Sequence, residues 1–149
     1  MRSIIQRVKK AKVSVDGKII GEIDKGLLIF LGVERDDGRD DLDYIISKSV
    51  NLRVFEDEKG RMNLSLKDIE GEVLVVPQFT LLGDVRKGRR PSFDMAARPE
   101  EAERLYIQLI DGLRGEGISV KSGQFQAYMD VELTNDGPVT IMLDSRKRF

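Results

Sequence analysis

The run Leu27–Val33 restricts the fold more than any other feature of the chain. It has the length of a β-strand and contains no polar side chain. A strand with one wet face alternates polar and apolar residues, whereas an uninterrupted apolar run is typical of a strand that is buried on both faces. We therefore predict that residues 27–33 lie at the centre of a sheet.

Other strands are predicted on both sides of this run. Asp16-Gly17 is a strong two-residue hairpin signal and joins two β-type segments. The predicted strands are residues 2–8, 12–15, 18–23, 52–55, 72–76, 118–121, 127–133 and 139–143.

Two segments have helical periodicity instead. Leu42, Ile45, Ile46, Ser49 and Val50 share one helix face, and acidic residues precede them. The second helix begins near Pro99, and its apolar face is Ala102, Leu105, Tyr106, Leu109, Ile110 and Leu113. Together these elements predict a mixed, β-rich α/β fold: curved, barrel-like mixed sheets with two long helices packed on one side. We expect a single domain over residues 1–149, with residues 145–149 as a frayed tail.

The composition limits the chemistry. The chain has no cysteine and no histidine, which excludes disulfides, thiolate nucleophiles, histidine bases and histidine or thiolate metal sites. The net charge is −1, so any basic surface must be local. No stretch has the length of a membrane span, and a cytoplasmic protein with no membrane partner is expected. Asp130 and Glu132 share a strand face, but such pairs are usually exposed sheet residues, and we predict no metal and no cofactor.

The segment from Pro77 to Phe93 combines a strand end with a basic loop, which holds Arg86, Lys87, Arg89 and Arg90. A solvated loop is the usual fate of such a charge run. The alternative is contact with nucleic-acid phosphates, because Gly88 lies among the cations and an aromatic residue follows.

Thr80 is the hydroxyl residue nearest to this strand end. As a nucleophile it would need an activating base, and the sequence offers none at an interpretable spacing, so a structural role is favoured. The successive backbone N–H groups of Gln78, Phe79 and Thr80 are the alternative chemical feature, as donors to a developing oxyanion.

Asn135-Asp136-Gly137-Pro138 interrupts the last β-type segment. Turn-forming residues followed by a proline favour a tight hairpin between two strands. A dedicated backbone device is the second interpretation, and composition and spacing leave both open.

Several short motifs, in order along the chain, resemble D-aminoacyl-tRNA deacylase of the bacterial and eukaryotic type. The match runs from Met1 to about Leu143. The motifs are Met1-Arg2, residues 6–8, 26–28, 51–55, 62–65, 77–81, 89–93 and 123–127, and Asn135-Asp136-Gly137-Pro138-Val139-Thr140.

The resemblance implies a hydrolase that cleaves the ester between a D-amino acid and the 3′ end of tRNA, and that also acts on glycyl-tRNA. It implies a metal-independent homodimer that binds tRNA and not DNA. In this family the Gly-Pro bond is cis, and its carbonyl oxygens project into the partner's active site and reject L-amino acids. Here those residues are Gly137 and Pro138.

By the same correspondence, Gln78, Phe79 and Thr80 supply N–H donors, and the 2′-hydroxyl of the tRNA orients the attacking water. Phe125 and Ala127 lie near the terminal adenosine or the amino acid, and residues 86–90 lie near phosphate. The chain departs from the family pattern at Pro77, where serine is usual, and at Leu82, where tyrosine is usual. A mechanism that uses the Thr80 hydroxyl as nucleophile stays open but ranks second. A non-catalytic RNA-binding module and a structural homodimer are the alternative functions.

Overall fold

The computed structural model describes residues 1–149 and contains two α-helices, eight strands and one short 3₁₀ turn. In chain order the elements are β1 (Arg2–Val15), β2 (Lys18–Ile23), β3 (Gly26–Gly32), α1 (Arg39–Asn51), β4 (Phe55–Glu56), β5 (Met62–Leu64), β6 (Glu72–Pro77), η1 (Phe79–Leu82), α2 (Pro99–Gly115), β7 (Ser119–Ser122) and β8 (Asp130–Asp144).

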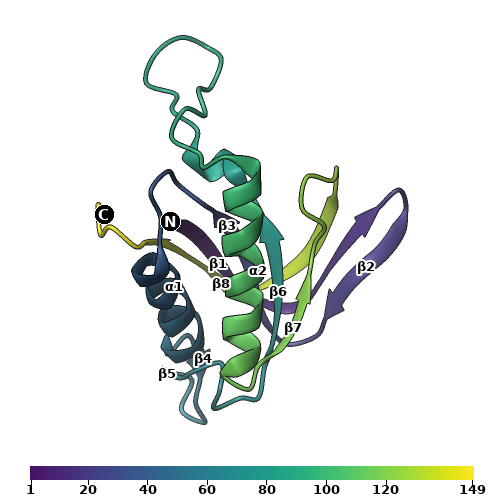
Figure 1. Cartoon of the computed structure of the whole chain (residues 1–149). Helices are drawn as coiled ribbons and strands as arrows, with labels where there is room; N and C mark the ends of the chain where they lie inside the picture. The colour runs from purple at the N-terminus through teal and green to yellow at the C-terminus, as the bar shows by residue number, and fades with distance from the viewer.

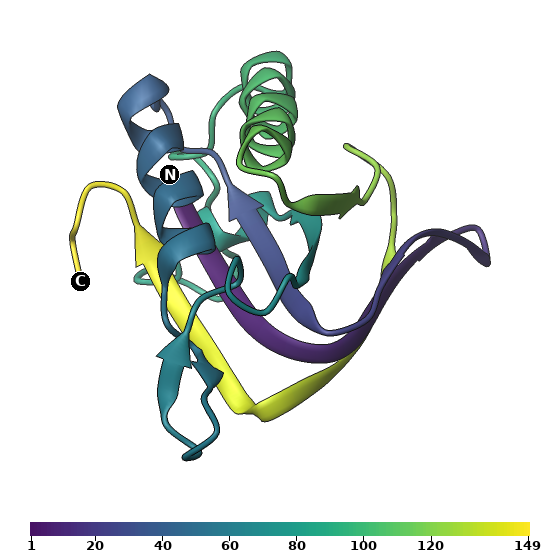
Figure 2. The same ribbon diagram turned by 90° about the horizontal axis from the view of Figure 1, so that it is seen from below.

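Six of the strands form one mixed sheet with the order β2-β1-β3-β6-β7, and β8 pairs with β1. β1 is antiparallel to β2, β3 and β8, whereas β3, β6 and β7 run parallel. The sheet curves until β2 comes close to β6 and β7, so the barrel is nearly closed (Figure 2). The predicted fold class is confirmed. β4 and β5 form a separate two-stranded ribbon.

β3 is the central strand that its apolar run predicts. Leu27, Ile29 and Leu31 point to the helix side of the sheet, whereas Leu28 belongs to the cluster on the concave side. β6 alternates in the same way, with Val73 and Val75 on one side and Leu74 and Val76 on the other. Each large apolar side chain buried in this way stabilises the fold by roughly 1.5–3 kcal/mol.

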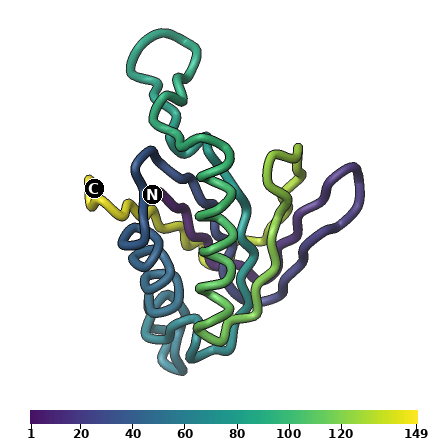
Figure 3. Tube along the Cα trace, viewed as in Figure 1, coloured from purple at the N-terminus to yellow at the C-terminus, as the bar shows by residue number.

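Both helices lie side by side on the same face of the sheet (Figures 1 and 3). The buried residues of α1 are the five predicted from the sequence, and those of α2 are Leu105, Tyr106, Leu109, Ile110 and Leu113. The helices approach closely at Gly112, where an added Cβ would lie 2.3 Å from Cδ1 of Ile46. Neither helix is long and apolar enough to cross a membrane.

The predicted hairpin at residues 135–138 is wrong. β8 is one continuous strand, and both of its halves pair with β1, from Ser14–Asp130 to Arg2–Asp144. β1 has 14 residues and is therefore long enough to pair with both halves of β8. The register of this pairing shifts on either side of Val8, which accommodates the bend in the two strands. The Asn135 side chain links the two ends of segment 136–138. Its Oδ1 accepts from the Val139 N–H at 2.7 Å, and its Nδ2 donates to the Val139 carbonyl at 3.1 Å. The strand predicted at residues 127–133 begins only at Asp130.

The chain end is also better held than the expected frayed tail. Arg148 donates to Glu34 Oε1 at 2.8 Å and to Asp144 Oδ2 at 2.9 Å. Arg146 donates to the Arg35 carbonyl at 2.6 Å and to Asp37 Oδ1 at 3.2 Å. The α-amino group of Met1 joins this network through Asp37 at 2.7 Å. The side chains of Glu34, Asp37 and Asp144 are fully buried, and the basic groups of the tail compensate their charge.

Candidate active site

A pocket of about 640 Å³ opens at the carboxyl ends of β3 and β6. Its walls are the ends of these strands, residues 78–80, the segment before α2 together with the first turns of α2, and the segment 125–131. The residues from the segment before α2 and from α2 are Ala96, Ala97, Pro99, Ala102 and Tyr106. Hydrophobic residues make up 13 of the 18 that line it. A largely apolar pocket with a few polar groups at its edge is typical of a small-ligand site.

Residues 78–80 form the polar edge of the pocket. The Gln78 N–H donates to the Leu31 carbonyl at 2.7 Å, so it extends the sheet and is not free for a ligand. Phe79 and Thr80 begin the 3₁₀ turn η1, and neither N–H has an acceptor within the chain. The first N–H groups of a helical turn have no internal partner, so these two are available as donors. The predicted set of three donors is therefore reduced to two.

The Thr80 hydroxyl has no base beside it. Its hydrogen-bond partner is the side-chain amide of Gln78, which donates to Thr80 Oγ1. An amide donor stabilises the hydroxyl oxygen as an acceptor and does not remove its proton. Activation as a nucleophile requires a general base in hydrogen-bond reach, so the geometry does not favour that role.

Tyr106 of α2 also lines the pocket, and the sequence marked it only as part of a helix face. Its hydroxyl lies 3.0 Å from the Val75 carbonyl and 3.1 Å from the Gly123 carbonyl. Its ring lies 6.0 Å from that of Phe125, a pocket residue, and burial raises the pKa of Tyr106 to about 12. The signal was present in the sequence: a tyrosine in an otherwise aliphatic helix stripe needs a partner for its hydroxyl.

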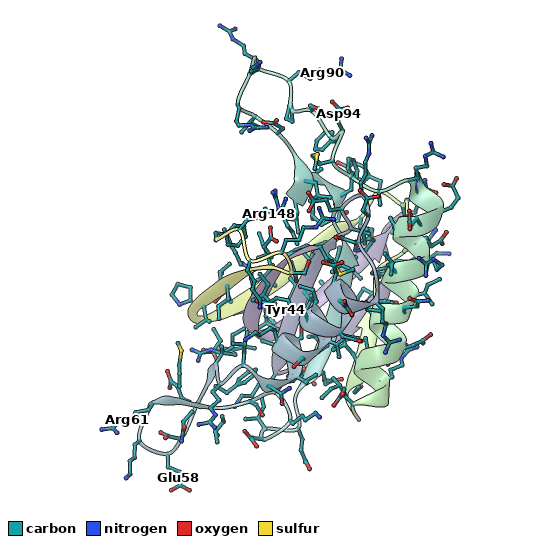
Figure 4. The ribbon with its side chains drawn as sticks, turned by 60° about the vertical axis from the view of Figure 1, so that its left-hand side comes forward. Tyr44, Glu58, Arg61, Arg90, Asp94 and Arg148 are labelled. Atoms are coloured by element: carbon teal, nitrogen blue, oxygen red, sulfur yellow. The ribbon has the colours of Figure 1, made fainter.

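The basic loop projects away from the body of the molecule above α2, and Arg90 lies near its tip (Figures 1 and 4). Asp84 and Ser92 close its base through two backbone hydrogen bonds of 2.7 and 3.0 Å. Arg86 forms an ion pair with Asp84, in which its Nε donates to Oδ1 at 2.9 Å and its Nη2 donates to Oδ2 at 2.6 Å. This pairing lowers the pKa of Asp84 to about 2. Lys87, Arg89 and Arg90 are exposed and form no ion pair. Phe93, just past the loop, meets Phe79 edge to face with the ring centroids 5.0 Å apart.

Gly137 and Pro138 lie outside the pocket of their own chain. The bond between them is cis, and both residues are exposed. Arg7 on β1 is buried and holds the backbone next to them, because its Nε donates to the carbonyl of the preceding residue, Asp136, at 2.8 Å. Arg7 pairs with Leu27 at the start of β3, whereas the pocket lies at the other end of that strand. A Cβ on Gly137, whose φ is +133°, would lie 2.7 Å from an Arg7 nitrogen.

The family model described as D-Tyr-tRNA(Tyr) deacylase matches residues 4–144. The chain belongs to the D-Tyr-tRNA(Tyr) deacylase family.

Two relatives named D-aminoacyl-tRNA deacylase, from Caldicellulosiruptor saccharolyticus and Clostridioides difficile, are each 60% identical over the full length of both chains. A solved structure described as c-Myc DNA Unwinding Element Binding Protein is 41% identical, with a TM-score of 0.91, and the alignment covers 97% of this chain and 98% of that one. The resemblance found in the sequence motifs is thus confirmed.

In this deacylase-family chain the predicted site residues fall into three places. Gln78, Phe79, Thr80, Phe125 and Ala127 meet in the pocket. The basic loop adjoins the pocket through Phe93. Gly137–Pro138 lies elsewhere on the same chain, so a single subunit does not bring all the predicted residues together.

Proposed function

We propose that this chain hydrolyses the ester between a D-amino acid and the 3′ end of tRNA. The observation that carries the proposal is the pair of unpaired N–H groups at Phe79 and Thr80, at the edge of an apolar pocket. Full-length relatives named for this activity support it.

In the proposed reaction the ester carbonyl enters the pocket with its oxygen towards the Phe79 and Thr80 N–H groups. Water attacks the carbonyl carbon, and negative charge develops on that oxygen, where two fixed donors stabilise it. The C–O bond to the ribose then breaks, and the ribose oxygen takes the proton that the attacking water gives up, which leaves the free amino acid and tRNA. An aminoacyl ester is already reactive, so a 2′-hydroxyl of the terminal adenosine that orients the water is sufficient in place of a protein base.

Chiral selection is assigned to Gly137 and Pro138 of a second subunit. Three observations support this: the two residues are exposed, they lie outside their own pocket, and Arg7 and Asn135 hold the backbone around them. Backbone oxygens fixed beside Cα would exclude an L side chain whatever its chemistry, while many D side chains are accepted. Glycine has no side chain to exclude, so glycyl-tRNA is a further substrate.

The tRNA backbone is assigned to the basic loop. Lys87, Arg89 and Arg90 are the cations free to neutralise phosphates, whereas Arg86 is already paired with Asp84. The proposed enzyme is a cytoplasmic homodimer.

A second candidate is nucleic-acid binding without cleavage. The projecting loop favours it, and so does the solved relative whose description names a DNA element. It predicts salt-dependent binding of RNA or DNA and no loss of the ester.

The test is to incubate the purified protein with D-tyrosyl-tRNA and with L-tyrosyl-tRNA, in the presence of a chelator, and to follow the esterified amino acid. Rapid loss of the D-ester alone is the expected result. Retention of both esters by a protein that still binds the tRNA would favour the second candidate and overturn the first.

A further inference from the structure

The pocket wall that carries Phe125 and Ala127 is attached to the sheet at a point where the strand ladder lacks a donor. β6 and β7 pair in parallel up to Val75 and Ser122, and the Gly123 N–H continues the ladder by donating to the Val75 carbonyl at 2.8 Å. In a parallel ladder, the next bond would run from the N–H of residue 77 to the Gly123 carbonyl. Residue 77 is Pro77, which has no N–H.

The Tyr106 hydroxyl occupies the place of that missing donor. It lies 3.1 Å from the Gly123 carbonyl, which no backbone N–H reaches. Its second contact, the Val75 carbonyl at 3.0 Å, already accepts the Gly123 N–H. Tyr106 is only 3% exposed, so its hydroxyl needs a partner within the chain, and the half-buried Gly123 supplies a carbonyl that lacks a backbone donor.

We infer that Tyr106 is a positioning residue for the deacylase site: its hydroxyl replaces the ladder hydrogen bond that Pro77 cannot make, and thereby fixes the wall formed by residues 123–127 against the end of β6. The expected effect of this hydrogen bond on activity rests on the proposed function. The inference assigns a reason for a buried hydroxyl in an apolar helix face.

Because the hydroxyl and the absent N–H serve the same acceptor, the two positions are coupled. Tyr106→Phe removes the hydroxyl and keeps the ring against Phe125. Pro77→Ala restores an N–H that can donate to the Gly123 carbonyl. Loss of one buried hydrogen bond corresponds to about a 10-fold change in an equilibrium or a rate.

The experiment is a double-mutant cycle with the wild type, Tyr106→Phe, Pro77→Ala and the double variant, measured by kcat/KM on D-tyrosyl-tRNA and by Tm. We expect Tyr106→Phe to lower kcat/KM by about 10-fold in the Pro77 background and by less than about 3-fold in the Ala background. Tyr44→Phe is the matched control, because the Tyr44 hydroxyl forms no hydrogen bond in the chain and lies on α1, away from the pocket; it should leave kcat/KM unchanged.

Equal losses in both backgrounds, or a Tyr106→Phe enzyme with wild-type kcat/KM, would overturn the inference. If Tyr106→Phe does not fold, recovery of the fold in the double variant supports the coupling, and failure of both variants refutes it. The Tm values test the hydrogen bond without reference to activity. A wild-type protein that does not hydrolyse the ester would therefore refute the proposed function and leave the coupling measurable.

Discussion

Phe79 and Thr80 show how much of the proposed chemistry depends on the main chain. Their N–H groups are free because a 3₁₀ turn begins at Phe79, one residue past the end of β6, whereas the N–H of the intervening Gln78 donates to the Leu31 carbonyl. The sequence could nominate the three successive N–H groups but could not separate them. Which N–H extends a sheet depends on the register of β3 against β6, and that register is a tertiary property.

Removing one of these donors should impair hydrolysis more than removing a side chain. Phe79→Pro deletes the N–H at the first position of the turn, where proline is tolerated, and Phe79→Ala deletes only the ring. We expect single-turnover hydrolysis of D-tyrosyl-tRNA by Phe79→Pro to be about 100-fold slower than by Phe79→Ala. Thr80→Val, which loses the hydroxyl and keeps the N–H, should stay near the wild-type rate.

Equal rates for Phe79→Pro and Phe79→Ala would remove the Phe79 N–H from the mechanism. A collapse of activity in Thr80→Val with an unchanged Tm would restore the hydroxyl as a nucleophile, against the geometry of its hydrogen bond.

Among the elements, the helices and the central strands were the most predictable from the sequence. The stripe Leu42, Ile45, Ile46, Ser49 and Val50 is the buried face of α1, because a helix face is defined by spacing within the helix itself. β8 was not predictable in the same way. Asn135–Pro138 has the local chemistry of a hairpin, but both flanking segments find the same long partner in β1. Pairing with a strand more than one hundred residues earlier leaves no local signal.

The basic loop is the element for which a binding prediction can be separated from catalysis. Arg89→Ala should weaken tRNA binding and lower the slope of log K against log salt by about 0.7–0.9, because one phosphate contact is lost. The matched control is Lys59→Ala, which removes an equal charge from the exposed turn beside Glu58 and Arg61, at the opposite end of the molecule from Arg90 (Figure 4).

Fluorescence titration with tRNA at several salt concentrations measures both variants. A slope for Arg89→Ala that equals that of the wild type, or an identical change in Lys59→Ala, would mean that the loop makes no specific phosphate contact.

Over the whole molecule, the two ends of the chain meet in a buried ionic network that also holds the segment after β3. The Arg148 hydrogen bond keeps the pKa of Glu34 below its ordinary value. A carboxyl with a depressed folded-state pKa stabilises the fold above its unfolded pKa, and this contribution is lost as the pH falls through the folded pKa. Arg148→Met should therefore lower the free energy of unfolding at pH 7 by about 1–3 kcal/mol and flatten its decline below about pH 4.5.

Denaturant unfolding between pH 3 and pH 7 tests this expectation. Arg39→Met is the control, because the Arg39 pair with Asp43 lies on the exposed surface of α1 and should contribute little. Parallel pH profiles for the wild type and Arg148→Met would show that the tail arginine does not stabilise the ionised Glu34.

The central claim at this scale is that each site is assembled from two chains, with the pocket from one subunit and Gly137–Pro138 from the other. Gly137→Ala should displace this segment, because its φ of +133° is unfavourable for alanine and the added Cβ meets Arg7. The homodimer of this variant should hydrolyse L-tyrosyl-tRNA as well as the D-ester. Gly60→Ala, at a positive φ in a remote exposed turn, should keep the discrimination of the wild type.

The most direct measurement is the D-to-L ratio of hydrolysis by a heterodimer of Gly137→Ala and Phe79→Pro subunits, purified through different tags placed after Phe149. Its competent pocket belongs to the Gly137→Ala subunit and faces the intact Gly137–Pro138 of the Phe79→Pro subunit. The account predicts that D-selectivity returns to the wild-type ratio, at about half the wild-type rate because one of two sites is complete. A heterodimer that hydrolyses the L-ester as the Gly137→Ala homodimer does would contradict a site shared between subunits.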